Sequence, residues 1–191
     1  MGKASLLAAA GVAALIGLAG CGGAGGDTGG AGDIPDNRAF GEYRPVGEQY
    51  AVKVPEGWAR TEIGDTATFT DKLNTITVTL GSSPAAPTTA DGTAALDALA
   101  GKTPGFAAGS VSTVQRRSGT ALLITYRADA PADPVTGKIV NDDVERYEFW
   151  HDRQLLTVTL AGPHGADNID PWRTVTDSVR WLNSATVTTG G

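Results

Sequence analysis

Few side chains in this sequence could do chemistry, and the first to consider are its two histidines, His151 and His164. A histidine acts as a general base toward a serine when a carboxylate orients it, and these residues need not be close in sequence. No Gly-x-Ser-x-Gly segment, which presents the serine in many hydrolases, occurs in the chain. His151 stands beside Asp152 in a segment explained more simply as a polar hairpin turn. No sequence motif supports nucleophilic catalysis. Because a triad can be assembled from distant residues, a hydrolase that uses His151 or His164 is kept as an alternative.

Carboxylates gather in one part of the sequence, around a loop rich in proline and glycine: Asp129, Asp133, Asp142, Asp143 and Glu145. Calcium binds where several carboxylate and carbonyl oxygens converge on a flexible loop. The spacing here matches no calcium-binding loop, and like charges on an exposed loop are usually only solvated. The Gly-x-x-x-x-Gly-Lys-Ser/Thr segment that cradles phosphate is also missing from the sequence. We therefore expect no bound metal and no cofactor.

The only cysteine, Cys21, ends an apolar N-terminal segment. Lys3 precedes an apolar run over 5–19, which is shorter than the roughly 20 residues of a transmembrane helix, and this layout is typical of a secretory signal. The residues Leu-Ala-Gly-Cys at 18–21 resemble the lipobox of bacterial lipoproteins. The resemblance implies that residues 1–20 are a signal peptide and that the Cys21 sulfur carries a diacylglyceryl group. The alternatives are an ordinary signal peptide with a chance cysteine and an uncleaved apolar N-terminus.

Export and a lipid anchor would restrict the partners of the protein. Removal of residues 1–20 leaves 171 of 191 residues and no second cysteine for an intramolecular disulfide. The formal net charge changes from −6 to about −7 because Lys3 is lost, and an acidic surface disfavours nucleic acid and anionic lipid. A two-chain lipid gives stable attachment to a membrane. We therefore expect a monomer on the extracytoplasmic face of the cell membrane, anchored through Cys21.

Composition divides the rest of the chain into a linker, a domain and a tail. Residues 21–47 are rich in glycine and poor in core residues, so they gain too little burial to offset the entropy of ordering and are expected to be a flexible linker. Phe40 and Tyr43 are the aromatic residues of this segment that could pack on the domain. We expect the domain over 48–183 and a polar tail over 184–191.

The domain is expected to be mostly β-sheet. Apolar and polar residues alternate in several short segments, most clearly at 75–80, where Ile76, Val78 and Leu80 share one face and threonines share the other. The four residues 151–154 are short enough to join two antiparallel strands as a hairpin. Strands are predicted over Tyr50–Val54, Trp58–Glu62, Thr66–Thr70, Thr75–Leu80, Val111–Arg117, Ala121–Ala128, Asp143–Trp150 and Leu155–Ala161.

Two segments have helical spacing instead. The first runs over 91–100 and is followed by Gly101, a residue that commonly ends helices. The second is expected to start with Asp170 as its cap and Pro171 in its first turn, and its apolar stripe is Trp172, Val175, Val179 and Leu182. The predicted order is thus four strands, a helix, four strands and a helix. This order predicts an α+β fold, in which two helices cover an antiparallel sheet.

Three segments carry a resemblance to a known family: YAVKVPEGW, VERYEFWHDRQLLTVTLAGP and DPWRTVTDSVRW. Together they resemble the PsbP-like family, and within it the LpqN-type lipoproteins of actinobacteria. The resemblance covers about 50–182. It implies an antiparallel sheet sandwiched between helices, in an exported and membrane-associated domain. Members of this fold are mostly binding or assembly factors, and the family offers no shared catalytic residue.

Two tryptophans are the candidate recognition residues. Trp172 belongs to the apolar stripe of the second helix and is expected to pack in the core. Trp181 falls beside that stripe, and Trp150 alternates away from Tyr147 and Phe149. Trp150 and Trp181 are therefore the better candidates for a binding surface.

These observations favour a non-catalytic function. The favoured hypothesis is a membrane-anchored binding or assembly module for a protein or a small envelope ligand. The alternatives are a cell-envelope hydrolase and a structural surface lipoprotein without a dedicated ligand. A pocket in which a histidine meets a hydroxyl or a carboxylate would favour the hydrolase. An apolar patch around Trp150 or Trp181 would favour the binding module.

Overall fold

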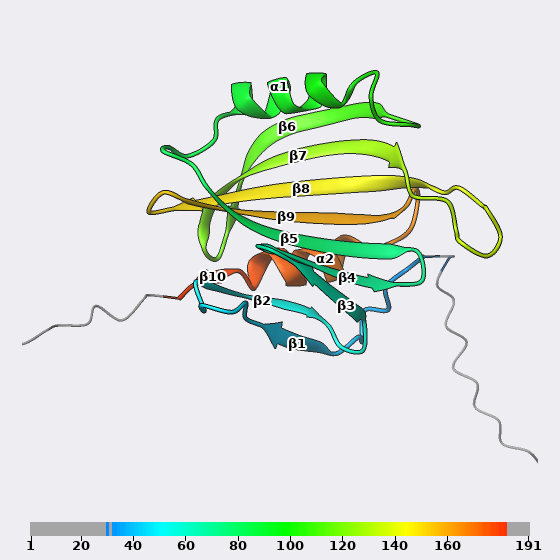
Figure 1. Cartoon of the computed structure of the whole chain (residues 1–191), viewed down its shortest axis with the longest axis horizontal. Helices are drawn as coiled ribbons and strands as arrows, with labels where there is room; N and C mark the ends of the chain where they lie inside the picture. The colour runs from blue at the N-terminus through cyan, green and yellow to red at the C-terminus, as the bar shows by residue number, and fades with distance from the viewer. Residues whose placement is uncertain (1–29, 31, 183–191) are drawn as a thin grey trace, which may run out of the picture.

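The computed structural model describes residue 30 and residues 32–182, which form ten strands and two helices (Figure 1). One set of strands is β1 (Phe40–Tyr43), β2 (Tyr50–Pro55) and β10 (Arg180–Trp181). The other is β3 (Ala59–Ile63), β4 (Thr66–Asp71), β5 (Asn74–Ser82), β6 (Ala107–Arg116), β7 (Gly119–Asp129), β8 (Asn141–His151) and β9 (Gln154–Pro163). They pair antiparallel as a small sheet, β1-β2-β10, and a large one, β3-β4-β5-β9-β8-β7-β6. The antiparallel α+β class is confirmed, and each of the eight predicted strands is present.

One face of the large sheet carries the main core. Val78 lies opposite Val158, and Ile76 lies opposite Leu160, at the centre of the sheet. Side chains alternate along a strand, so the threonines between these residues point to the opposite face. The small sheet and helix α2 (Ile169–Asp177) pack on the apolar face, where Trp172 and Val175 join the same core cluster. The alternation at 75–80 and 155–161 therefore correctly predicted which side is buried.

Helix α1 (Thr89–Leu99) lies on the other face of the sheet and contacts β6 and β7 (Figure 1). Leu96 packs there on Leu122 and Ile124. A Cβ atom at Gly92 would lie 2.6 Å from the Val111 Cγ1 atom, so glycine allows this close approach. The two helices thus lie on opposite faces of the large sheet, but α1 covers only the edge formed by β6 and β7. The predicted α/β/α sandwich is present only in part. Among the described residues, no helix is long and apolar enough to span a bilayer.

The folded domain includes residues before 48, which corrects the predicted extent of the linker. Strand β1 pairs with β2 inside the segment 21–47. Tyr43 packs edge-on against Phe69, with ring centroids 5.1 Å apart, and Ile34 is buried. The signal is hidden in the sequence because β1 has only four residues, among them a glycine and a glutamate. Residues 1–20, Cys21 and the tail 184–191 lie outside the described residues.

Helix α2 also differs from its prediction at both ends. Its N-cap is Asn168 rather than Asp170, and it ends at Asp177 rather than at Leu182. The Ser178 hydroxyl donates to the Val175 carbonyl at 2.6 Å and accepts from the Lys53 backbone N–H at 2.7 Å. Ser178 therefore ends the helix and joins the chain to β2. Val179 remains buried, but in an extended segment that continues into β10.

A buried hydrogen-bond cluster, which we call the N-terminal latch, fixes residues 32–34 to the domain. The Asn168 Oδ1 atom accepts from the Ile34 backbone N–H at 2.8 Å. The Asn168 amide donates to the Asn74 Oδ1 atom at 3.0 Å and to the Gly32 carbonyl at 3.2 Å. The Asn74 amide donates to the same carbonyl at 2.7 Å. A Cβ atom at Gly162 would lie 2.4 Å from the Asn74 Oδ1 atom, so glycine is required beside the latch.

Candidate functional site

A cavity lies between β7, β8 and the start of α2, and we call it the β7–β8 pocket. Its volume is about 420 Å³, within the range of small-molecule sites. Thr125 and Arg127 of β7 face it together with Asp143 and Glu145 of β8, because these residues alternate onto the α2 side of the sheet. Its other walls come from Ala107 in β6, from the loop after β9 and from α2. The lining from the end of β9, the loop and the helix includes Pro163, His164, Ala166, Asn168, Ile169 and Trp172.

His164 and Asp143 form a pair at the rim of this pocket. The Nδ1 atom of His164 lies 2.9 Å from each carboxylate oxygen of Asp143. The Gly165 backbone N–H also donates to Asp143, at 3.2 Å. The two side chains are 56% and 40% exposed, so water reaches both of them. With a proton on Nδ1, His164 donates to the Asp143 carboxylate, and this bond fixes the orientation of the imidazole ring.

A chain of polar contacts positions Glu145 in the pocket wall. The Tyr147 hydroxyl donates to the Glu145 Oε2 atom at 2.7 Å, and an Arg116 N–H donates to the same hydroxyl at 2.9 Å. Burial is the main reason that the pKa of Tyr147 is raised to about 12. Arg116 also donates to Thr176 of α2 at 3.0 Å. The same contacts therefore hold α2 against the sheet and fix a carboxylate in the pocket wall.

The rest of the wall is mainly apolar. Trp172 packs from α2, and Ala107 and Pro163 contribute from β6 and β9. The indole N–H of Trp172 has no hydrogen-bond partner in the described chain. An apolar wall with a few fixed polar groups is typical of sites that bind small molecules.

Catalysis would need more than the His164–Asp143 pair. Within residues 30 and 32–182, no hydroxyl or thiol forms a hydrogen bond with His164. The Thr125 hydroxyl, which lines the pocket, is instead bonded to the Ser110 backbone N–H at 2.8 Å. In a serine triad the aspartate is buried behind the histidine, whereas Asp143 is exposed. The pair therefore provides a base without a bonded nucleophile.

The two tryptophans chosen from the sequence do not lie together. Trp181 stacks on His151, with ring centroids 5.4 Å apart. Trp150 is the neighbour of His151 in β8, so it points to the opposite face, where its N–H donates to the Ser83 carbonyl at 3.0 Å. Both are only partly exposed, and neither lines the β7–β8 pocket. Their role in binding stays a prediction.

The acidic residues that were weighed as a calcium loop are also separated. Asp143 and Glu145 face the β7–β8 pocket, whereas Asp142 alternates to the α1 side of the sheet. Asp129 accepts from the Asn141 amide at 2.9 Å, and Asp133 closes its own turn with Thr136. Among the described residues, no group of three or more acidic, cysteine or histidine side chains is placed to hold a metal ion.

The pairing of His164 with Asp143 was missed, although the sequence carries a signal for it. The predicted hairpin at 151–154 is present, and His151 pairs with Gln154. Counting outward from that turn places Asp143 opposite Gly162, which is the observed register. His164 comes two residues later, just beyond the strand. Antiparallel pairing alone therefore brings the two residues close together.

No family model matches the sequence, and no curated protein matches it. Solved structures are similar in fold. The chain matches the solution structure of cyanobacterial PsbP from Synechocystis sp. PCC 6803 at 15% identity and a TM-score of 0.55, covering 86% of this chain and 99% of that one. It matches the Saccharomyces cerevisiae Ran-binding protein Mog1p at 11% identity and a TM-score of 0.55, covering 76% of this chain and 97% of that one. The chain spans about half (48%) of a Bacteroides thetaiotaomicron protein that it matches at 11% identity and a TM-score of 0.49, with 75% of this chain covered.

The matches to PsbP and Mog1p define the class of fold. The antiparallel sheets and two helices have the arrangement seen in PsbP and Mog1p. The PsbP-like fold that was expected from three sequence segments is therefore confirmed.

Proposed function

We propose that the protein is a membrane-anchored extracytoplasmic lipoprotein, resembling the LpqN type, that binds a small envelope ligand without transforming it. The observation that carries the binding role is the β7–β8 pocket, which combines an apolar wall with fixed polar groups. The lipobox-like segment ending at Cys21 supports the anchor. A lipid anchor would confine the pocket to a thin layer and so raise its effective concentration toward ligands of the membrane.

The polar groups of the pocket suggest how the ligand is held. Glu145 and Asp143 present carboxylate oxygens from one strand, and Arg127 lies opposite Asp143 on the next strand. Donors and acceptors on two neighbouring strands, beside an apolar wall, suit a ligand with a polar end and an apolar body. A protein partner is also compatible with the fold, because the similar Mog1p is a Ran-binding protein.

The hydrolase is the second candidate, because a histidine and a carboxylate do meet in a pocket. In this alternative the pair would activate a water molecule as the nucleophile. The binding role is favoured because Asp143 is exposed and because His164 has no bonded nucleophile in the described chain. The two candidates differ in whether the ligand leaves the pocket unchanged.

The anchor is tested with a Cys21→Ser variant. We expect the full-length wild-type protein to incorporate a palmitate analogue in actinobacterial cells and to sediment with membranes. The variant should lose the label completely, because its serine has no thiol to receive the diacylglyceryl group. A variant that is still labelled, or that stays in the membrane fraction, would contradict the lipoprotein proposal.

The pocket is tested by filling it. We expect native mass spectrometry of the wild-type protein, gently released from membranes, to show a bound small molecule, and an Ala107→Trp variant to reduce its occupancy at least tenfold. Ala59→Trp, on the exposed strand at the opposite sheet edge, is the matched control and should retain the ligand. Equal occupancy in both variants would contradict the proposed site, and no bound mass in any sample would favour a structural lipoprotein. Conversion of the ligand that disappears in His164→Ala would favour the hydrolase.

A further inference from the structure

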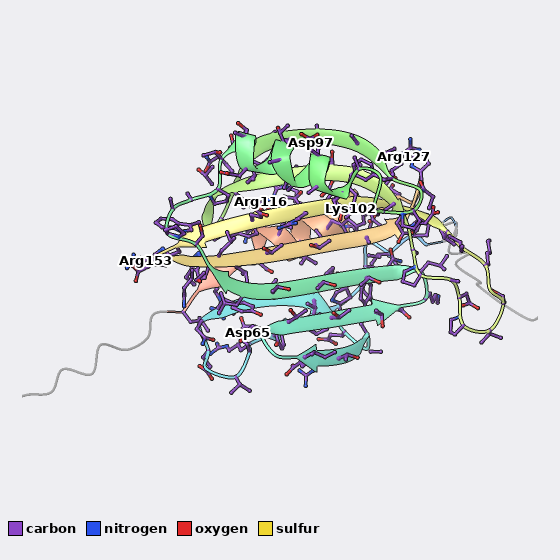
Figure 2. All side chains as sticks on the ribbon, turned by 45° about the horizontal axis from the view of Figure 1, so that its top comes forward. Asp65, Asp97, Lys102, Arg116, Arg127 and Arg153 are labelled. Carbon is purple, nitrogen blue, oxygen red and sulfur yellow. The ribbon has the colours of Figure 1, made fainter. Side chains whose placement is uncertain are left out.

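A second cavity, which we call the Tyr50 pocket, lies where the small sheet meets the edge of the large one. Its volume is about 260 Å³. Its wall includes Tyr43, Val46, Tyr50, Glu62, Asp65 and Leu80. None of these residues lines the β7–β8 pocket. Figure 2 shows Asp65 well away from Arg127, which marks that first pocket.

Two buried phenols open onto this cavity. Tyr50 is 1% exposed and Tyr43 is 6% exposed. The Tyr50 hydroxyl is in polar contact with Tyr43, and the Tyr43 hydroxyl is in polar contact with Glu62. A hydroxyl oxygen has two lone pairs, so each phenol can still accept a hydrogen bond. Neither oxygen is among the buried polar atoms without a partner, and both residues line the cavity, so a ligand or water there can donate to them.

Two carboxylates give the cavity a negative potential. Glu62 comes from β3, and Asp65 comes from the turn before β4. Burial raises the pKa of Tyr50, and the contact with Tyr43 and the nearby charges of Glu62 and Asp65 raise it further. These effects keep the phenol protonated at neutral pH.

No positive side chain lines the cavity, and of its two carboxylates only Glu62 is in an ion pair among the described residues. The described lining contains no lysine, arginine or histidine. Arg60 pairs with Glu62 at 3.4 Å and lies over the Tyr43 ring, outside the lining. Asp65 forms no ion pair with any described residue. An anion is therefore repelled from the cavity, and a cation would find an acceptor in Asp65.

We propose that the Tyr50 pocket binds a primary ammonium group on a short alkyl chain. Such a group has three N–H donors, and the two phenol oxygens and the Asp65 carboxylate supply three acceptors. Pro45, Val46 and Leu80 provide the apolar wall for the alkyl carbons. A quaternary ammonium lacks N–H donors and could not donate to the phenol oxygens. A lysine side chain of a partner and the amine of a lipid headgroup share this chemistry.

The proposal is tested by NMR titration of the full-length protein. We expect n-butylammonium to shift the backbone amide signals of Gly64 and Asp65, whereas n-butanol and butyrate at equal concentration do not. Asp65→Asn should weaken the affinity at least fivefold, because it removes the charge and keeps the shape. Tyr50→Phe should also weaken it, through the loss of one acceptor. Asp97→Asn, which lies on α1 far from the cavity (Figure 2), is the matched control and should bind as the wild type does.

Two outcomes would overturn the proposal: equal binding of n-butanol and n-butylammonium, or unchanged affinity in both Asp65→Asn and Tyr50→Phe. The spectrum of each variant without ligand shows directly whether it is folded. Comparison of Nα-acetyl-lysine amide with ethanolamine then distinguishes the two sources of the ammonium group. Tighter binding of the lysine derivative indicates a protein partner, and tighter binding of ethanolamine indicates a headgroup.

Discussion

Asn168→Ala is expected to lower the free energy of unfolding by about 3 kcal/mol. The Asn168 side chain is 3% exposed and makes three hydrogen bonds in the N-terminal latch. Alanine would leave the Ile34 N–H and the Asn74 Oδ1 atom buried without these partners, and each such group costs about 1–3 kcal/mol. Urea unfolding followed by tryptophan fluorescence measures the change, which is large against a typical total of about 5–15 kcal/mol.

The matched control is Asn37→Ala in the same N-terminal segment. Asn37 is exposed, so its substitution should change the free energy of unfolding by less than about 0.5 kcal/mol. Amide hydrogen exchange gives a second readout, because the Ile34 N–H should lose its protection in Asn168→Ala. The latch would be of little importance for stability if both variants unfolded at the same urea concentration as the wild type.

Asp142→Asn is expected to stabilise the protein at pH 7.5 by about 2 kcal/mol and to have little effect near pH 4. The Asp142 side chain is 7% exposed, and its Oδ1 atom has no hydrogen-bond partner among the described residues. Burial, together with the charges of Asp143 and Asp129, raises its pKa from 3.8 to about 6. One pKa unit corresponds to about 1.4 kcal/mol, so ionisation of this group opposes folding.

The direction in which stability changes with pH follows from proton binding to Asp142. Between pH 4 and pH 6 the folded state holds a proton on Asp142 that the unfolded state has lost, so the contribution of this group to stability falls as the pH rises. Urea unfolding at pH 4.5 and pH 7.5 measures this dependence in the wild type and in Asp142→Asn. Hydrogen bonds from Thr136 lower the pKa of Asp133, so Asp133→Asn should change stability in the opposite direction. An equal effect of Asp142→Asn on the free energy of unfolding at the two pH values would contradict the prediction that ionised Asp142 opposes folding.

Much of the fold could be predicted because its strands obey a simple alternation. Ile76 and Val78 pair with Leu160 and Val158, and each strand shows its buried face in its own sequence. The hairpin at 151–154 fixes the register of β8 and β9, and with it the meeting of Asp143 and His164. Local patterns were sufficient wherever neighbouring segments of the chain pair with each other.

The features that could not be predicted from the sequence depend on contacts between distant segments of the chain. Val179 and Trp181 continue the spacing of a helix, yet Ser178 ends α2 because it bonds to Lys53 more than a hundred residues earlier. The Tyr50 pocket likewise combines Tyr43, Tyr50 and Asp65 from two sheets. No single segment of the sequence shows that these residues face one cavity.

The N-terminal latch also determines how the domain would respond to mechanical force. A Cβ atom at Gly32 would lie 2.4 Å from the ring of Pro163, and Gly32 bonds to Asn168; both of these partners line the β7–β8 pocket. A pull on the chain at residue 32 would therefore load the wall of the β7–β8 pocket at Asn168 together with the strand ends at Asn74 and Pro163. Tension along the N-terminal segment would thus act on the shape of this pocket.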